Sequence, residues 1–262
     1  MQRKLKRVTM LAVLTATLVF GVALASAELV ERGDLFVKFE GGINPTALPR
    51  TTNAPISVRI DGTVKSLSGE QPPALRRISI AINRGGRIDT RGLPVCRRSQ
   101  IESASAQQAL TACGSSLVGR GRFAAEASFP EQSSFPLKGG ILAFNTVVDG
   151  GRAILAHVYG NTPFPNSRIF VFRIRETEGT FGTVLSATLP PALNRYGYLK
   201  RIVLELRREF VVRGQVRSYL SAACSAPKGI NIGIFPFVRV GMGFEDGRKL
   251  SSTLIRTCRV RK

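Results

Sequence analysis

The chain of 262 residues has no tryptophan, one histidine, four cysteines and 17 acidic residues. The single histidine excludes a zinc site built on several histidines, and no C-x-x-C pair is present for a zinc or redox site. With four tyrosines besides, the chain lacks the aromatic platforms typical of sugar-binding sandwiches, whereas its 15 phenylalanines suit a core. The glycine-rich stretch NRGGR lacks the Lys-Ser/Thr ending of a phosphate loop, and we expect no cofactor and no metal.

The single histidine also limits hydrolytic chemistry. A Ser-His-acid arrangement would have to use His157, which lies in the apolar segment AILAHVYG and shares a strand face with Leu155 and Tyr159. No G-x-S-x-G elbow accompanies it, so we assign no catalytic residue and favour a histidine that is hydrogen-bonded in or beside the core. The alternative is that His157 lines a pocket at a sheet edge.

The N-terminal segment is typical of a secretory signal peptide. Four basic residues in MQRKLKR precede the uncharged run TMLAVLTATLVFGVALA, and small residues end at Ala27, where we expect cleavage. A membrane anchor is the alternative, because the run is close to the length of a spanning helix. Later apolar stretches are too short to span, so we expect a secreted or envelope-associated chain with no transmembrane segment after cleavage.

The four cysteines are expected to form two disulfides, because an exported chain meets an oxidising environment. Three pairings are possible. We favour Cys96 with Cys113 and Cys224 with Cys258, for which chain entropy gives about 3 kcal/mol and a little under 4 kcal/mol.

A short helix is expected inside the first of these loops. Ser99 and Glu102 look like a capping box, but a helix from there to Cys113 rises about 21 Å. The three residues that lead from Ser99 back to Cys96 span only about 10 Å, so the sulfur atoms of Cys96 and Cys113 would lie too far apart to form a disulfide. We therefore expect a later start, with Ser105 and Gln108 as the capping box of about eight helical residues; otherwise the pairing is different.

The chain is strongly basic. Lysine and arginine number 38, the formal net charge is +21, and removal of residues 1–27 would leave +17. Of the 38 basic residues, 29 are arginines, and they are scattered instead of forming one block. Such charge attracts polyanions but does not determine fold. Two explanations of the basic charge are open: it forms a surface that faces polyanions, or it reflects only the amino-acid composition that a GC-rich genome produces.

The rest of the chain reads as all-β, with short alternating runs separated by Gly, Pro, Asn and Asp. The run at 56–60 places Ile56, Val58 and Ile60 on one face, and the run at 76–83 repeats this pattern. We expect further strands at 34–40, 117–129, 140–148, 152–159, 168–174, 180–189, 198–212, 215–220, 232–244 and 249–258.

Four turn signals predict hairpins, at residues 83–86, 149–151, 213–214 and 246–247, where Gly, Asn, Asp or Arg lies between apolar runs. The segment 198–212 is ambiguous, because its apolar residues also fit a helical stripe. We prefer a strand, because a hairpin signal follows at once and one face is uniformly charged.

A dozen strands with one short helix predict an antiparallel β-sandwich. About 235 residues after cleavage fit a single domain at 28–262, and the stretch 128–140 is a candidate seam or a long loop.

Several segments together carry a resemblance: INRGGRIDTRGLPVC, ILAFN, AILAHVYG, GTFGTVLSATLP, SYLSAAC and KLSSTLIRTC. In these the chain resembles a group of secreted, β-rich actinobacterial proteins. The resemblance covers most of the chain after residue 27 and implies export and a disulfide-bonded β fold. No activity, cofactor or site residue is implied.

Two hypotheses on function follow. The favoured one is a non-enzymatic envelope or extracellular protein that faces anionic wall polymers or lipid headgroups through arginines such as Arg201, Arg207 and Arg213, because Arg makes bidentate phosphate contacts. The alternative is a small-ligand-binding protein or hydrolase with a pocket near His157. A protein this basic would bind nucleic acid in vitro through its charge alone. Such binding does not indicate a natural partner, and we do not expect nucleic acid to be one.

Overall fold

A computed structural model describes residues 28–129, 131–160, 165–190 and 197–261. Strands make up 63% of the structure and helices 7%, so the all-β prediction is confirmed. The predicted signal peptide and its cleavage site at Ala27 lie outside the described residues. Among the described residues, no helix has the length and apolar content needed to cross a membrane.

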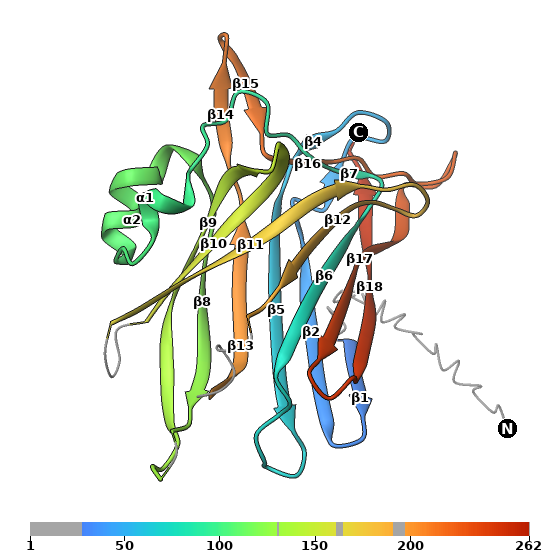
Figure 1. The fold of residues 1–262 in the computed structure, drawn as a ribbon. Coiled ribbons are helices and arrows are strands. Elements are labelled where there is room, and N and C mark those ends of the chain that lie inside the picture. Colours follow the sequence, from blue (N-terminus) through green and yellow to red (C-terminus); the bar gives the residue numbers. More distant parts are fainter. Residues whose placement is uncertain (1–27, 130, 161–164, 191–196, 262) are drawn as a thin grey trace, which may run out of the picture.

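One thirteen-stranded sheet dominates the structure (Figure 1). Its neighbours pair antiparallel, except that β3 lies parallel to β18. In spatial order the strands are β1 (Glu28–Arg32), β2 (Leu35–Asn44), β5 (Ser57–Ser66), β13 (Gly197–Leu206), β8 (Leu117–Ala127), β9 (Phe135–Val148), β10 (Gly151–Gly160), β11 (Asn166–Glu176), β12 (Phe181–Thr188), β6 (Leu75–Asn83), β17 (Ile232–Phe244), β18 (Lys249–Val260) and β3 (Ala47–Leu48).

This sheet is a curled half-barrel and not clearly a sandwich. Strands from the N-terminal and C-terminal halves of the chain pair with one another in this one sheet. Because the sheet twists and coils, opposite parts of its concave face pack against each other. The curl brings β1 against β18 at the two ends of the sheet. Arginine side chains bridge these ends: Arg32 donates to the Lys249 carbonyl at 3.0 Å, and Arg248 donates to Asp34 at 2.6 Å.

Two smaller sheets and a helical segment complete the fold. The first sheet consists of β4 (Ala54–Pro55), β16 (Leu220–Ala222) and β7 (Gly86–Ile88), and the second is the hairpin of β14 (Glu209–Val212) and β15 (Gln215–Ser218). The helical segment comprises α1 (Arg98–Ile101), α2 (Ala106–Cys113) and a 3-10 turn at Gly114–Ser116. It lies outside the curled sheet, against β9 and β10 (Figure 1).

Both predicted disulfides are confirmed, as Cys96–Cys113 and Cys224–Cys258. The helix between the first pair has eight residues, and Ser105 and Gln108 form its capping box. The chain from Cys96 turns through α1, which the sequence analysis did not predict, before α2 begins. This detour brings the two cysteines together while leaving α2 intact.

Three of the four predicted hairpins form, joining β9 to β10, β14 to β15 and β17 to β18. The prediction at 83–86 is wrong, because β7 pairs with β16 and not with β6. The Asn83 side chain accepts from the Gly85 amide and donates to the Pro236 carbonyl, which turns the chain out of the large sheet.

The segment 198–212 is extended, as preferred from the sequence, but it breaks at Arg207 and Arg208 into β13 and β14. The candidate seam at 128–140 joins β8 and β9, which are paired along their length in the large sheet. Its C-terminal part, from Phe135, belongs to β9.

Candidate functional site

The concave face of the half-barrel encloses an apolar cavity of about 140 Å³. Aliphatic side chains from both walls of the curl supply most of its lining. They include Ile60, Ile80, Ile154, Leu185, Leu204 and Leu206. Several belong to the largest buried cluster of the protein, so the cavity is a hollow within the core.

Two small residues help to leave this space open. Ala143 of β9 and Ala156 of β10 are direct cross-strand partners on the concave face, and both line the cavity. Each is almost fully buried, at 1% and 8% exposure. Because their neighbours in the lining are larger, the pair leaves a recess that a leucine at either position would occupy.

The lining becomes polar at one end, where Asn83, Gly85, Gly86 and Arg87 lead from β6 into β7. Arg87 and Ser225, which line the same end, are exposed, so this end reaches solvent. It forms the mouth of the cavity. Arg87 is exposed there, and no ion pair to it is found in the part of the chain that the structure describes.

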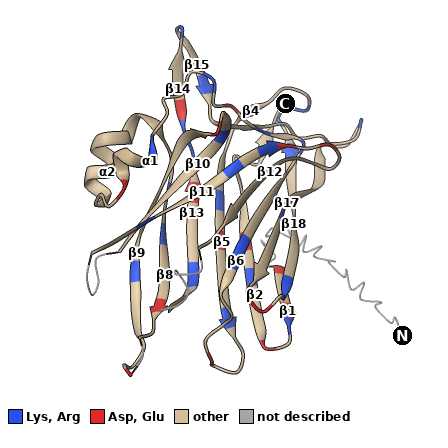
Figure 2. Cartoon of the chain, in the orientation of Figure 1, with Lys and Arg blue, Asp and Glu red and all other residues tan. Residues whose placement is uncertain are grey.

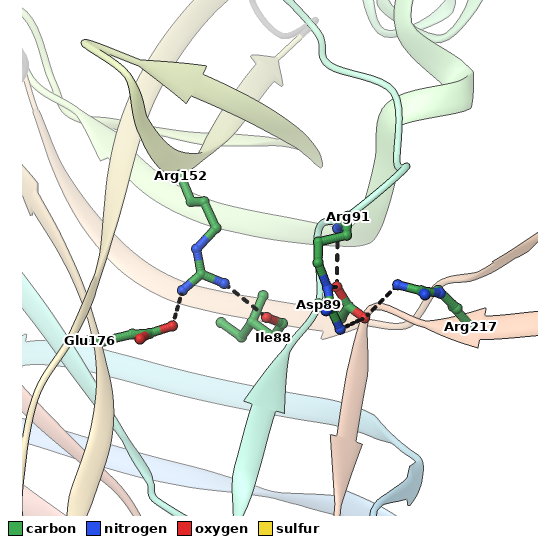
Figure 3. A network of polar contacts seen from close by, with 6 residues as sticks. All are labelled: Ile88, Asp89, Arg91, Arg152, Glu176 and Arg217. Carbon is green, nitrogen blue, oxygen red and sulfur yellow. Dashed lines mark hydrogen bonds and ion pairs between the residues drawn. The ribbon is translucent and has the colours of Figure 1, made fainter. Parts of the chain in front are cut away.

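Three arginines hold the β7 wall of the cavity and the residue that follows it in place (Figure 3). Arg152 donates to the Ile88 carbonyl at 3.0 Å and to Glu176 at 2.7 Å. Beside them, Asp89 accepts from Arg91 at 3.0 Å and from Arg217 at 3.4 Å. The hydrogen bonds from Arg91 are the main reason why the pKa of Asp89 is lowered. Ile88, which lines the cavity, is thereby fixed from both sides.

His157 does not line this cavity. It lies on the convex face of β10, fully buried, with Nε2 at 2.9 Å from the Ala104 carbonyl and 3.0 Å from Ser167 Oγ. Because a carbonyl oxygen only accepts, Nε2 carries the hydrogen. Burial lowers the pKa of His157, although the bond to Ala104 opposes this. The imidazole thus joins the link between α1 and α2 to the sheet.

The structure does not bring Arg201, Arg207 and Arg213 into one cluster. Arg201 lies within β13 and donates to both oxygens of Asp61, at 2.9 and 2.6 Å, which lowers the pKa of that carboxyl. Arg207 follows the end of β13, and Arg213 is at the tip of the β14–β15 hairpin with a φ of 51°.

A different group of cations gathers on the convex face around β13. Arg59 and Arg120 are the cross-strand partners of Glu205 on its two sides, and Arg122 is the partner of Val203. With Arg201 on the same face, four arginines lie near the carboxylates of Asp61 and Glu205, and Glu40, which is ion-paired to Lys38, is the cross-strand partner of Asp61. Blue segments lie on β5, β8 and β13 in Figure 2, although cations also occur elsewhere.

Sequence reasoning missed the cavity. Its signal was an alanine at an inward position in each of two consecutive apolar strands, in ILAFN and AILAH. Within the described residues, no group of three or more His, Cys, Asp or Glu side chains could hold a metal ion.

Comparisons with protein-family models, curated proteins and solved structures found no match to the chain.

Proposed function

We propose that this chain is a non-enzymatic binding protein that holds a small apolar molecule, or the end of an alkyl chain, in the cavity of the half-barrel. The apolar cavity with a mouth at β7 and β17 carries this proposal. Ligand sites are typically concave and largely apolar, with a few polar groups that fix orientation. Here those polar groups are Asn83 and Arg87 at the mouth.

The size of the cavity limits its occupant. A buried apolar cavity of about 150 Å³ stays dry and binds benzene. A space of similar volume suits an aromatic ring or a short alkyl segment and is too small to enclose a drug-sized molecule. The ligand is therefore either a small hydrocarbon-like molecule or a longer amphiphile whose polar end remains at the mouth.

Filling the recess tests the proposal. We expect Ala143→Leu to abolish the rise in melting temperature that benzene or cyclohexane produces in the parent protein, because binding to the folded state alone stabilises it. Ala124→Leu, on the convex face of β8, should leave that rise unchanged. An equal rise in the parent and in Ala143→Leu would place the ligand elsewhere and contradict the proposal.

The convex arginines support a second candidate function, which is association of an exported protein with anionic wall polymers. Four arginines and Lys38 against the three carboxylates of Glu40, Asp61 and Glu205 leave a local excess of positive charge, and guanidinium groups suit phosphate recognition. We propose this role for Arg120 and Arg122 in particular, because both are exposed and no salt bridge to them is found among the described residues.

Co-sedimentation with isolated cell walls across a salt series tests this second function. Arg120→Gln/Arg122→Gln is expected to weaken binding roughly uniformly and to reduce its salt dependence, since each removes one cationic contact. Arg168→Gln/Arg175→Gln removes the same charge from β11 and serves as the control. Equal losses in both double variants would mean that net charge alone drives association.

A further inference from the structure

An apolar tip lies beside the mouth of the cavity. It consists of Ile230, Ile232, Ile234 and Ile255, whose exposed fractions are 53%, 50%, 74% and 55%. Ile232 and Ile234 alternate along β17 and therefore point to one side of it. Ile255 of β18 pairs with Pro236, one alternation further along the same face. Scattered surface isoleucines are ordinary, but four on one hairpin form a patch.

The chain that presents this tip is held in a fixed shape. Arg50 donates to the carbonyls of Ala226, Pro227 and Ile230, at 2.6, 2.7 and 3.0 Å. Behind the tip, the Cys224–Cys258 disulfide packs against Gly233, on the face opposite to the isoleucines. The exposed side chains are therefore supported from beneath, and the tip does not depend on folding when it meets a partner.

The residues of the β17–β18 hairpin around the tip carry charge of one sign, whereas Glu28 and Glu40 of the neighbouring strands lie near Arg256. Residues 226–244 and 248–262, which include both strands of this hairpin, contain no aspartate or glutamate. Lys228 precedes Ile230 in the turn, and Arg259 is the direct cross-strand partner of Ile232. Both cations are exposed. An apolar patch bordered by cations complements a surface that is anionic outside and apolar just beneath.

We infer that this isoleucine tip docks on anionic lipid bilayers. In this arrangement the isoleucines enter the boundary between headgroups and acyl chains, while Lys228 and Arg259 lie at the level of the lipid phosphates. Gly233, which lies between Ile232 and Ile234 on β17, lines the cavity from the opposite face of the strand, so docking of the tip brings this end of the cavity close to the membrane. Exchange of an alkyl chain between bilayer and cavity would follow, and this last step rests on the proposed function.

Vesicle binding tests the docking. The chain beginning at Glu28, which contains every described strand, helix and disulfide, is sedimented with vesicles of phosphatidylglycerol and phosphatidylcholine in equal parts. Ile232→Ser/Ile234→Ser is expected to weaken binding at least roughly tenfold, because burial of an exposed isoleucine contributes on that scale. Binding of the parent should fall as salt is raised and should be far weaker on pure phosphatidylcholine.

Val211→Ser/Val216→Ser is the matched control. These valines are 66% and 69% exposed on the β14–β15 hairpin and belong neither to the isoleucine tip nor to the cavity lining, so their loss should leave binding unchanged. An equal loss in the control, no binding by the parent, or equal binding to neutral vesicles would overturn the inference. The inference would also be overturned if the parent were a dimer that does not bind vesicles and the isoleucine variant were a monomer, since the tip would then be an interface between two copies.

The cavity variant separates this inference from the proposed function. Ala143→Leu is expected to bind the anionic vesicles as the parent does, because it leaves the tip unchanged. Vesicle binding by a protein that takes up no benzene would uphold the docking and contradict the cavity proposal. Benzene uptake without vesicle binding would do the reverse.

Discussion

At the scale of single residues, burial decides what His157 can do. The side chain is enclosed under the helical segment, its Nε2 bonds to Ala104, and its pKa is lowered. A base with these contacts is neutral near pH 7 and is held away from the cavity. Alternation along the strand predicts correctly that His157 shares a face with Leu155 and Tyr159, but it does not indicate which face of the sheet α1 and α2 cover.

This burial predicts a pH dependence of stability. An unfolded histidine has a pKa near 6.5, so the unfolded state takes up the proton first as the pH falls below that value. Stability is therefore fully present above about pH 6.5 and is lost toward the lower pKa of the folded state. We expect the free energy of unfolding, measured with urea, to fall between about pH 7 and pH 5 in the parent, and to fall less in His157→Gln.

The carboxylates act in a different range. The pKa values of Asp34, Asp61 and Asp89 are lowered from 3.8, so their contribution is lost below about pH 4. The two effects are thus separable. An identical slope between about pH 7 and pH 5 in the parent and in His157→Gln would show that the histidine is not held neutral by the fold.

At the scale of elements, close approach of β8 and β13 shapes the sheet. A Cβ atom at Gly121 would overlap the Val203 carbonyl oxygen and come within 3.0 Å of Leu204 Cα. Since both are backbone atoms, the strands would have to separate. The GRGRF segment at residues 119–123 is accordingly part of a strand whose glycines permit tight pairing.

Gly121→Ala should therefore destabilise the protein by about 1–3 kcal/mol or more, the usual cost of overpacking. Gly140→Ala is the matched control, because a Cβ there meets nothing within 4 Å in the same sheet. Chemical denaturation of both variants measures the difference. Similar stabilities would mean that β8 and β13 can move apart freely.

Local elements were predictable where local geometry constrained them. The capping box of Ser105 and Gln108 was predictable because the rise of a helix and the reach of the chain back to Cys96 exclude an earlier helix start. The turns at 149–151, 213–214 and 246–247 were predictable because their residues accept positive φ. The turn at 83–86 had the same composition, but a long-range bond from Asn83 to Pro236 redirects it. Nothing within that window of sequence indicates this partner.

At the scale of the whole molecule, strand order is what the sequence did not reveal. β13 lies between β5 and β8, and β6 lies between β12 and β17, so pairings between distant segments decide the curl. Alternating patterns identify which side chains are buried, but they are the same for two packed sheets and for one sheet closed upon itself. The cavity is a consequence of the second arrangement.

Arginine has two roles at this scale. Arg32, Arg152, Arg201 and Arg248 form hydrogen bonds within the fold, joining sheet ends or fixing strands. Part of the large basic charge is therefore structural. The remaining exposed cations, around the convex face and the isoleucine tip, are those available to anionic partners.

Methyl NMR of the parent during a benzene titration shows whether the cavity of the half-barrel binds an apolar ligand. We expect saturable shifts at the methyl groups that line the cavity, such as those of Ile80, Leu185 and Leu204, with none at the exposed Val211 and Val216, which do not line it. Shifts that never saturate, or that appear equally on the surface valines, would contradict a ligand site inside the half-barrel.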